Sequence, residues 1–425
     1  MERYRQRIAD QMLRDKLDVI GAVLIEGPKA CGKTSTAEQQ AASVLYLDDP
    51  ETMAQNLQLA ETNIKKLLQG ATPHLIDEWQ LAPQLWDAIR FDVDHRDGDG
   101  LFMLTGSAVP ADTSRIHHSG AGRFGWLTMR PMTLWESGES TGDVSLASLF
   151  RNAESVSGES NLSLDQMAFA VCRGGWPKAV QKKSPRAALS QIKEYFRAIV
   201  WSDISRVDAV NRDAERAVRL MRSYARHQGA QATVAAIKAD LAANESTEMS
   251  DNTVESYLNA LRKIFVIEDM PAWNPNLRSK TAIRTTDTRY FVDPSVAATA
   301  LGLSPDDLIN DLNTFGLLFE TMAVRDLRVY AEALNGKVYH YRDKNNLECD
   351  AVVHLRDGRY GLVEIKLGGD DLINEGAAAL KSLADKIDPE KMKAPSFMMV
   401  LIGVGTYAYR REDGIYVVPI GCLKD

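Results

Sequence analysis

The chain has 425 residues, more than one ordinary hydrophobic core accommodates, so we expect two to four domains. Its net charge of −8 excludes a globally basic nucleic-acid-binding protein, and any such binding must use a local patch. Four scattered cysteines form no CxxC pair, which argues against a zinc site and for a reducing compartment. Because no apolar run reaches membrane-spanning length and the N-terminus has the pattern of a charged helix, we predict a cytoplasmic protein without a membrane partner.

The first organised stretch, residues 23–36, has the pattern of a phosphate-binding loop. An apolar run at 19–25 predicts a buried strand, and residues 35–44 predict a helix after the loop. Strand, GxxxxGK[ST] loop and helix, in this order, are the context that such a loop requires. Its expected nucleotide-binding residues are Gly27, Pro28, Lys29, Ala30, Cys31, Gly32, Lys33, Thr34 and Ser35. We expect the loop amides to bind phosphates, Lys33 to reach the outer phosphates, and Thr34 to ligate Mg²⁺.

The next strands carry acidic residues at their ends. Residues 43–49 predict a strand ending in two aspartates, which are either functional or turn residues. Helical patterns follow at 51–69 and, after the next strand, at 81–94. That strand, at the start of the sequence HLIDEWQ, ends in Asp77 and Glu78. In a phosphate-loop protein, Asp77 would hold Mg²⁺ through water and Glu78 would activate the attacking water.

A further strand and two arginines complete the candidate catalytic set. Residues 101–107, LFMLTGS, predict a buried strand. Thr105 or Ser107 at its end would contact the terminal phosphate or the attacking water; the alternative is a simple turn around the glycine. Arg123 and Arg130 are candidates for a guanidinium that stabilises transferred charge, although surface arginines are common.

Taken in order, the segments GPKACGKT, LIDEWQ, LTGS and GRFGWLTMRPMTLWE resemble the AAA-type ATPases of bacteria and archaea that carry a C-terminal domain of unknown function. The likeness covers most of the chain and is strongest over residues 20–136. It implies ATP and Mg²⁺ as cofactors, LTGS as a sensor segment and Arg123 as a candidate arginine finger. If Arg123 acts on a neighbour's nucleotide, the protein must oligomerise.

The middle of the chain is expected to contain a linker, a helical lid and a winged helix-turn-helix. Residues 138–160 are rich in Ser, Gly and acidic residues, which is typical of a linker or exposed insertion. The lid would comprise helices at 164–171 and 187–203. The winged helix would comprise helices at 213–227, 233–242 and 251–265 and strands at 266–272 and 289–292, around a basic loop with Arg278, Lys280 and Arg284.

The third of these helices is the candidate DNA-reading element, because in such folds it enters a groove. Side chains on or near it that would reach DNA are Tyr257, Asn259, Arg262 and Lys263. The alternative is that the module contacts protein, since the helix also carries Glu255 and has only a modest positive charge.

The C-terminal block has the pattern of a PD-(D/E)xK nuclease. A helix at 311–334 precedes strands at 338–342, 348–353 and 359–366; a helix at 377–387 and strands at 397–404 and 414–419 follow. The candidate site comprises Glu320 on the first helix, Asp350 one hairpin before the last of those strands, and Glu364 and Lys366 on one face of that strand. In such nucleases the carboxylates bind a metal that activates water, and the lysine stabilises charge.

Two observations bear on this interpretation. The resembled family also has a restriction-endonuclease-like appearance in this domain, whereas ExK alone arises by chance about once in a chain of this length. The other interpretation is a structural cluster in which Lys366 neutralises Glu364 and Asp350.

We therefore predict an α/β protein with four parts: an AAA-type phosphate-loop NTPase core at 1–137, a linker and helical lid at 138–212, a winged helix-turn-helix at 213–296 and a restriction-endonuclease-like domain at 297–425. The predicted function is Mg²⁺-dependent ATP binding and hydrolysis, coupled to a DNA- or protein-directed C-terminal module. The alternatives are an ATP-regulated nuclease and a slow nucleotide-gated switch that binds protein. Expected partners are ATP, DNA through the winged helix and the nuclease-like domain, and a protein partner or a second copy of the chain.

Overall fold

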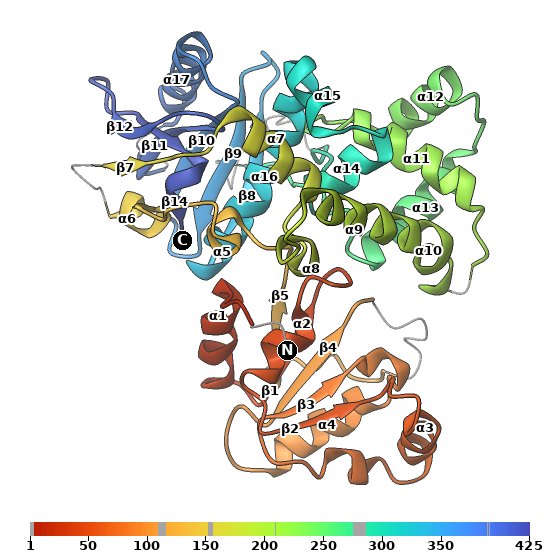
Figure 1. Ribbon diagram of the computed structural model, residues 1–425. Coiled ribbons are helices and arrows are strands. Elements are labelled where there is room, and N and C mark those ends of the chain that lie inside the picture. Colours follow the sequence, from red (N-terminus) through yellow and green to blue (C-terminus); the bar gives the residue numbers. More distant parts are fainter. Residues whose placement is uncertain are drawn as a thin grey trace. The chain divides into compact units, whose positions relative to one another are not determined.

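The computed structural model describes residues 4–108, 116–151, 156–208, 210–274, 286–388, 390 and 392–425. It contains two compact units, each assembled from separate stretches of the chain. Unit 1 comprises Met1–Arg130, Trp201–Arg212 and Asn259–Val266; unit 2 comprises Pro131–Val200, Asp213–Leu258 and Ile267–Asp425. Figure 1 labels their elements.

Unit 1 contains a parallel sheet with the strand order β2–β3–β4–β1–β5. Its strands are β1 (Ala22–Glu26), β2 (Ser43–Tyr46), β3 (His74–Asp77), β4 (Phe102–Gly106) and β5 (Phe124–Thr128). Strands β3 and β4 are buried at every residue, as expected where both faces of a parallel sheet are covered. In the register, Glu26 pairs with Gly106 and Asp77 with Thr105, so the ends of β1, β3 and β4 lie at one edge of the sheet.

The helices of unit 1 are shorter than the sequence pattern predicts. They are α1 (Ile8–Leu17), α2 (Lys33–Glu38), α3 (Met53–Thr62), α4 (Leu85–His95) and α10 (Ile204–Arg206), with 3₁₀ turns at Ile64–Leu68 and Trp79–Leu81. The helix expected at 51–69 is divided because Asn63 leaves the helical region, with φ −153°. In the core, the Trp86 ring of α4 stacks on Phe124 of β5 with centroids 3.8 Å apart.

Unit 2 contains a mixed sheet with the strand order β7–β12–β13–β11–β10–β9–β8. The strands are β7 (Gly158–Glu159), β8 (Gly336–Arg342), β9 (Glu348–Leu355), β10 (Tyr360–Lys366), β11 (Phe397–Ile402), β12 (Tyr407–Arg410) and β13 (Tyr416–Pro419). Strands β8, β9 and β10 pair antiparallel, whereas β10, β11 and β13 pair parallel. Helix α16 (Leu312–Ala333) precedes β8, and α17 (Asp370–Ala384) connects β10 to β11. Helix α17 begins seven residues earlier than expected, directly after Gly369.

Residues 138–160 are not an exposed linker in their described part. They contain β6 (Val144–Ser145), α6 (Leu146–Phe150) and β7, and they follow α5 (Leu134–Ser137). Strand β6 pairs with β14 (Leu423–Lys424), and β7 pairs with β12. Val144, Leu146 and Leu149 are buried, so a few apolar residues within a polar segment anchor it to unit 2.

The remaining helices of unit 2 are α7 (Leu164–Arg173), α8 (Pro177–Val180), α9 (Pro185–Ala198), α11 (Ala214–Arg226), α12 (Val234–Asn244), α14 (Pro294–Leu301) and α15 (Pro305–Asn310). Helix α13 (Asp251–Lys263) contributes residues to both units. The helix expected at 187–203 ends as an α-helix at Ala198 and continues as a π-helix over Ile199–Asp203. The described part of the chain contains no helix with the length and hydropathy needed to cross a membrane.

The expected winged helix is only partly represented. Helices α11, α12 and α13 form as predicted, but the two wing strands are reduced to the isolated bridges Ile267–Phe291 and Met270–Thr288. The basic loop with Arg278, Lys280 and Arg284 lies outside the described residues. Tyr257 is buried and its hydroxyl accepts a hydrogen bond from the Asp213 backbone N–H at 3.0 Å. The expectation that Tyr257 reaches DNA is therefore wrong.

Candidate functional site

The loop after β1 has a backbone shape that requires glycine at two positions. Gly27 has φ +144°, and a Cβ there would lie 2.1 Å from the carbonyl oxygen of Met129. Gly32 has φ +106° and directly precedes α2. Side chains disfavour both conformations, so the sequence pattern and the observed backbone agree. The loop packs closely against the segment that follows β5.

Lys33 lies inside the curve of this loop. Its side chain is buried, and its ammonium donates hydrogen bonds to the carbonyl oxygens of Gly27 and Pro28, each at 2.8 Å. Lys29 points elsewhere: it is half exposed and forms a 2.6 Å ion pair with Asp203 of unit 1. Of the two lysines, Lys33 is therefore the one that the loop holds for a phosphate.

The other expected loop residues have different environments. Ala30 has a left-handed backbone with φ +61°. Cys31 is fully buried, and its Sγ lies 3.7 Å from the carbonyl oxygen of Met129. Ser35 is exposed on α2. These three residues shape the loop or adjoin it, while its charge comes from the lysines.

Arg7 is a loop-positioning residue that the sequence pattern does not reveal. Its buried guanidinium donates to the carbonyl oxygen of Cys31 at 2.7 Å and to that of Arg130 at 2.8 Å. The Cys31 carbonyl belongs to the same planar trans peptide as the Gly32 N–H, so the two point in opposite directions. By fixing the carbonyl, Arg7 fixes the direction of a loop amide. No local signal marks this contact, because it joins residues 24 positions apart.

Asp77 connects the loop to β3. Its Oδ1 accepts a hydrogen bond from the Thr34 hydroxyl at 2.9 Å and another from the Thr105 hydroxyl. Burial raises the pKa of Asp77 and the negative charge of Asp48 adds to this, whereas the hydrogen bonds from Thr105 and Thr34 lower it. A hydroxyl and a carboxylate oxygen meeting at this point are the type of donors that Mg²⁺ prefers, so the residues fit the metal.

Glu78 has an unusual backbone for a residue with a side chain. It lies in the left-handed region with φ +56°, and its Oε2 accepts hydrogen bonds from Gln80 and, at 3.5 Å, from Ser107. Strained conformations of this kind concentrate at functional sites. Burial raises the pKa of Glu78, and its hydrogen bond from Gln80 opposes this shift. A raised pKa brings a carboxylate closer to the range in which a general base is effective.

Arg123 lies at the amino-terminal end of the parallel strands, whereas the loop lies at their carboxyl-terminal end. Its backbone carbonyl accepts from the Ala22 N–H at the start of β1, whereas the loop follows the end of that strand. The guanidinium forms a 2.7 Å ion pair with Asp94 at the end of α4. The other candidate, Arg130, follows β5 and lies at the loop's edge. Within unit 1, the structure thus separates Arg123 from the phosphate loop.

A second candidate cluster lies in unit 2. Lys366 of β10 is 2.9 Å from Glu364 and 3.8 Å from Asp350 of β9, and Asp350 accepts the backbone N–H of Ile365 at 2.7 Å. Burial is the main reason that the pKa values of Glu320 and Glu364 rise to about 8, and the charge of Asp350 adds to both shifts. The four predicted residues therefore influence one another electrostatically.

This cluster has one member that sequence reasoning missed and no evident metal geometry. The buried Tyr290 hydroxyl donates a hydrogen bond to Glu320. Among the described residues, no group of three or more His, Cys, Asp or Glu side chains is arranged to hold a metal ion. The Lys366 ammonium is ion-paired with two of the three carboxylates, Asp350 and Glu364, which is the geometry of a buried ion-paired cluster.

Comparison with family models gives three matches along the chain. Residues 20–137 match a model described as an AAA domain. Residues 164–307 and 315–423 match two models described as domains of unknown function, DUF8612 and DUF4143. The first match covers β1, the phosphate loop, β3 and β4, and the other two carry no statement of activity.

Comparison with individual proteins gives distant similarities. An uncharacterized protein of Mycobacterium tuberculosis (strain ATCC 25618 / H37Rv) is 24% identical over 363 residues, covering 85% of this chain and 74% of that protein. Among solved structures, a Walker-type ATPase of Pyrococcus abyssi is 14% identical with a TM-score of 0.42, covering 69% of this chain and 94% of the other. The Aeropyrum pernix ORC2 protein, in ADPNP–ADP complexes, is 13% identical with a TM-score of 0.33, covering 74% and 97%. The AAA-domain match, together with the parallel sheet and its phosphate loop, supports an AAA-type nucleotide-binding ATPase.

Proposed function

We propose that the chain binds ATP with Mg²⁺ in unit 1 and hydrolyses it. The observation that carries this proposal is the 2.9 Å hydrogen bond between Thr34 of the phosphate loop and Asp77 at the end of β3. It joins the two halves of the expected site, which are 43 residues apart in the sequence. The AAA-domain match over residues 20–137 supports the same reaction class.

The residues have distinct roles in this proposal. Loop amides and the Lys33 ammonium bind the phosphates. To do so, Lys33 gives up its hydrogen bonds to the carbonyl oxygens of Gly27 and Pro28. Thr34, and Asp77 through water, would hold Mg²⁺, which supplies charge neutralisation at the phosphates when bound. Glu78 accepts a proton from the attacking water.

The sensor residues act beside this set. Thr105 donates to Asp77, and Ser107 donates to Glu78, so both hydroxyls orient the carboxylates. If Arg123 has a catalytic role, it acts on the nucleotide of a second copy of the chain. In its own unit it lies at the end of the strands opposite to the phosphate loop. Loss of activity in Arg123→Ala that is restored by mixing with Lys33→Ala protein would support that role.

Two substitutions test the proposed reaction. Lys33→Ala should abolish measurable ATP binding, because it removes the charge at the outer phosphates. Glu78→Gln should bind ATP with an unchanged Kd and hydrolyse it about 10²–10⁴-fold more slowly, the range expected for loss of a general base. Binding is measured by calorimetry with Mg²⁺, and hydrolysis by phosphate release. Lys65→Ala, an exposed lysine of the same unit, is the control. Normal ATP binding by Lys33→Ala would contradict the proposal.

A second candidate function is metal-dependent cleavage of nucleic acid by unit 2. The proximity of Asp350, Glu364 and Lys366 favours it, together with the preceding helix α16 and the mixed sheet. This activity should appear with Mg²⁺ or Mn²⁺ and disappear in Lys366→Ala, while Lys33→Ala leaves it intact. An absence of cleavage across DNA and RNA substrates would leave Lys366 as the structural partner of the two carboxylates.

A further inference from the structure

Helix α9 and the segment before it form a concentrated basic surface. Residues 177–198 contain six Lys or Arg residues and one acidic residue, Glu194, in a chain whose net charge is −8. All six cationic side chains are exposed: Lys178, Lys182, Lys183, Arg186, Lys193 and Arg197. In the described part of the chain, no acidic side chain forms an ion pair with any of them. This surface therefore carries positive charge that the fold itself does not neutralise.

Three of these side chains lie in one line along the helix. Arg186, Lys193 and Arg197 are separated by seven and four residues, so at 3.6 residues per turn they share one face of α9. Between the first and last, the helix rises about 16 Å. Ser190 lies on the same face and is also exposed.

The opposite face of α9 is anchored in unit 2. Ala188 and Ile192 are buried, and Tyr195 packs against Trp176 with ring centroids 4.1 Å apart. The helix is thus held by apolar contacts on one side and presents a cationic stripe on the other, a rigid arrangement suited to an extended anion.

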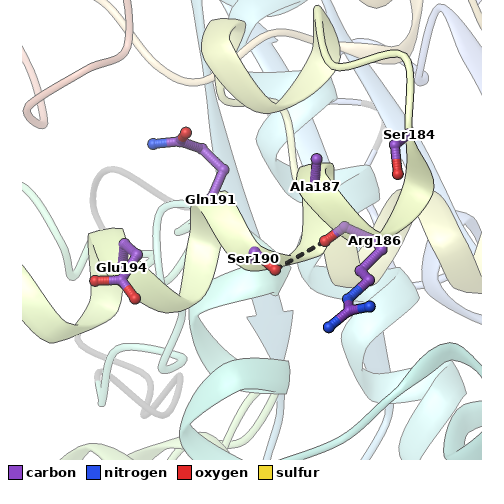
Figure 2. Close-up of a pocket in the computed structure, with 6 residues that line it drawn as sticks. All are labelled: Ser184, Arg186, Ala187, Ser190, Gln191 and Glu194. Atoms are coloured by element: carbon purple, nitrogen blue, oxygen red, sulfur yellow. Dashed lines mark hydrogen bonds between the residues drawn. The ribbon is translucent and has the colours of Figure 1, made fainter.

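Beside the stripe is a hollow of about 420 Å³, lined by Ser184, Arg186, Ala187, Ser190, Gln191 and Glu194. Figure 2 shows Arg186 and Gln191 extending from the helix in different directions, with the Ser190 hydroxyl donating to the Arg186 backbone carbonyl at 2.9 Å. Beside the Glu194 carboxylate, the hollow offers the Ser184 hydroxyl, the Gln191 amide and the Arg186 guanidinium as donors. Donors of these kinds contact phosphate oxygens in protein–DNA complexes.

We propose that the α9 stripe binds the phosphodiester backbone of duplex DNA without reading its sequence. A duplex carries one charge per about 1.7 Å of its axis, so a length of about 16 Å presents roughly nine phosphate charges to the three cations of the stripe. Single strands are instead bound on exposed aromatic side chains, and the aromatic residues of α9, Tyr195 and Phe196, are only partly exposed.

The surface is distinct from the helix expected to read DNA. On α13, Arg262 and Lys263 are balanced by Asp251 and Glu255, whereas α9 together with its leading segment has a marked excess of positive charge. The proposal does not depend on ATP hydrolysis.

The test is the binding of a labelled 25-base-pair duplex of arbitrary sequence, followed by fluorescence anisotropy without nucleotide between 50 and 200 mM salt. If all six cations contact phosphates, the wild type should lose roughly 10³-fold in affinity over this range. The triple variant Arg186→Ala/Lys193→Ala/Arg197→Ala keeps three contacts and should lose only about 40-fold, from a weaker starting affinity. The control Lys65→Ala/Lys66→Ala/Lys337→Ala removes the same charge from exposed lysines elsewhere and should behave as the wild type.

Three results would overturn the proposal: equal duplex binding by the α9 triple variant and the wild type, an equal loss in the control triple variant, or tighter binding of a single-stranded oligonucleotide. The charge-conserving variant Arg186→Lys/Arg197→Lys guards against misfolding, because it should keep the wild-type salt dependence. If this variant loses binding as the alanine variant does, the side chains act structurally and the proposal is wrong.

Discussion

At the scale of single residues, Gly27 tests the geometry of the phosphate loop directly. Gly27→Ala would place a Cβ 2.1 Å from the Met129 carbonyl oxygen, whereas Gly122→Ala, also at a positive φ (+78°), meets nothing within 4 Å. We expect the Gly122 variant to lose about 1 kcal/mol from backbone strain alone. The Gly27 variant should lose at least about 2 kcal/mol more and bind ATP weakly. Thermal unfolding and ATP titration measure both; equal effects of the two variants would contradict the close approach.

The predicted residues that the structure brings together are those whose positions are defined by neighbours in the chain. Lys33 and Thr34 belong to one short motif, and Asp77 and Glu78 end one short strand, so their proximity follows from the parallel sheet. The distance of Arg123 from the loop depends on which end of β5 it occupies, and its neighbours in the sequence do not specify that end. Arg7 and Tyr290 act through contacts that only the tertiary structure creates.

At the scale of elements, helix α1 serves as a support for the phosphate loop. Arg7 precedes this helix, and its backbone N–H donates to Asp10 at 2.8 Å, which holds its guanidinium against the loop. Arg7→Ala should weaken ATP binding roughly 10-fold or more, because it removes a charged hydrogen bond of about 1.5–3 kcal/mol. Arg14→Ala, on the exposed side of α1, is the matched control. ATP titration compares the two, and an unchanged affinity in Arg7→Ala would show that the loop keeps its shape unaided.

Some elements could be read from periodicity and others could not. The long helix α16 and the buried strands β3 and β4 have hydrophobic patterns that identify them from their own residues alone. The two-residue strands β6 and β7 have no such pattern, since each exists only by pairing with a distant segment. The expected wing strands show the reverse case. Their composition favours strands, but the described backbone pairs only at isolated positions.

At the scale of the whole molecule, a buried histidine makes the stability of the chain sensitive to acid. His340 of β8 is 3% exposed and its ring contacts the Thr286 carbonyl and Gln231, each at 3.1 Å. Burial lowers its pKa from 6.5 to about 4. Between these values the unfolded chain binds more protons than the folded one, so the free energy of unfolding falls as the pH falls.

The predicted consequence is measurable by thermal unfolding between pH 7 and pH 5. His340 should account for about 2 kcal/mol of the stability lost over this range, which corresponds to roughly 4–8 °C in Tm. His340→Gln should therefore show a smaller decrease in Tm than the wild type, whereas His118→Gln, an exposed histidine, should not. Identical pH profiles for wild type and His340→Gln would exclude this role.

The division of the chain into two units cannot be deduced from its composition. Both units combine stretches that are far apart in the sequence, and helix α13 contributes residues to each unit. Boundaries drawn at changes in composition cannot detect this, because composition does not record which distant segments share a core. The polar segment 138–160 shows why: its few buried side chains, such as Val144 and Leu149, determine where it packs.

The pairing of β6 with β14 also determines the order in which the chain can fold during synthesis. The strands of the unit 1 sheet all lie before residue 129, so this sheet can form early on the ribosome. Val144 must wait for Leu423, about 280 residues later, or roughly 15–55 s at ordinary rates of translation. Throughout that interval the apolar side chains around β6 lack their final partner, so we expect chaperones to bind this segment until Leu423 has left the ribosome.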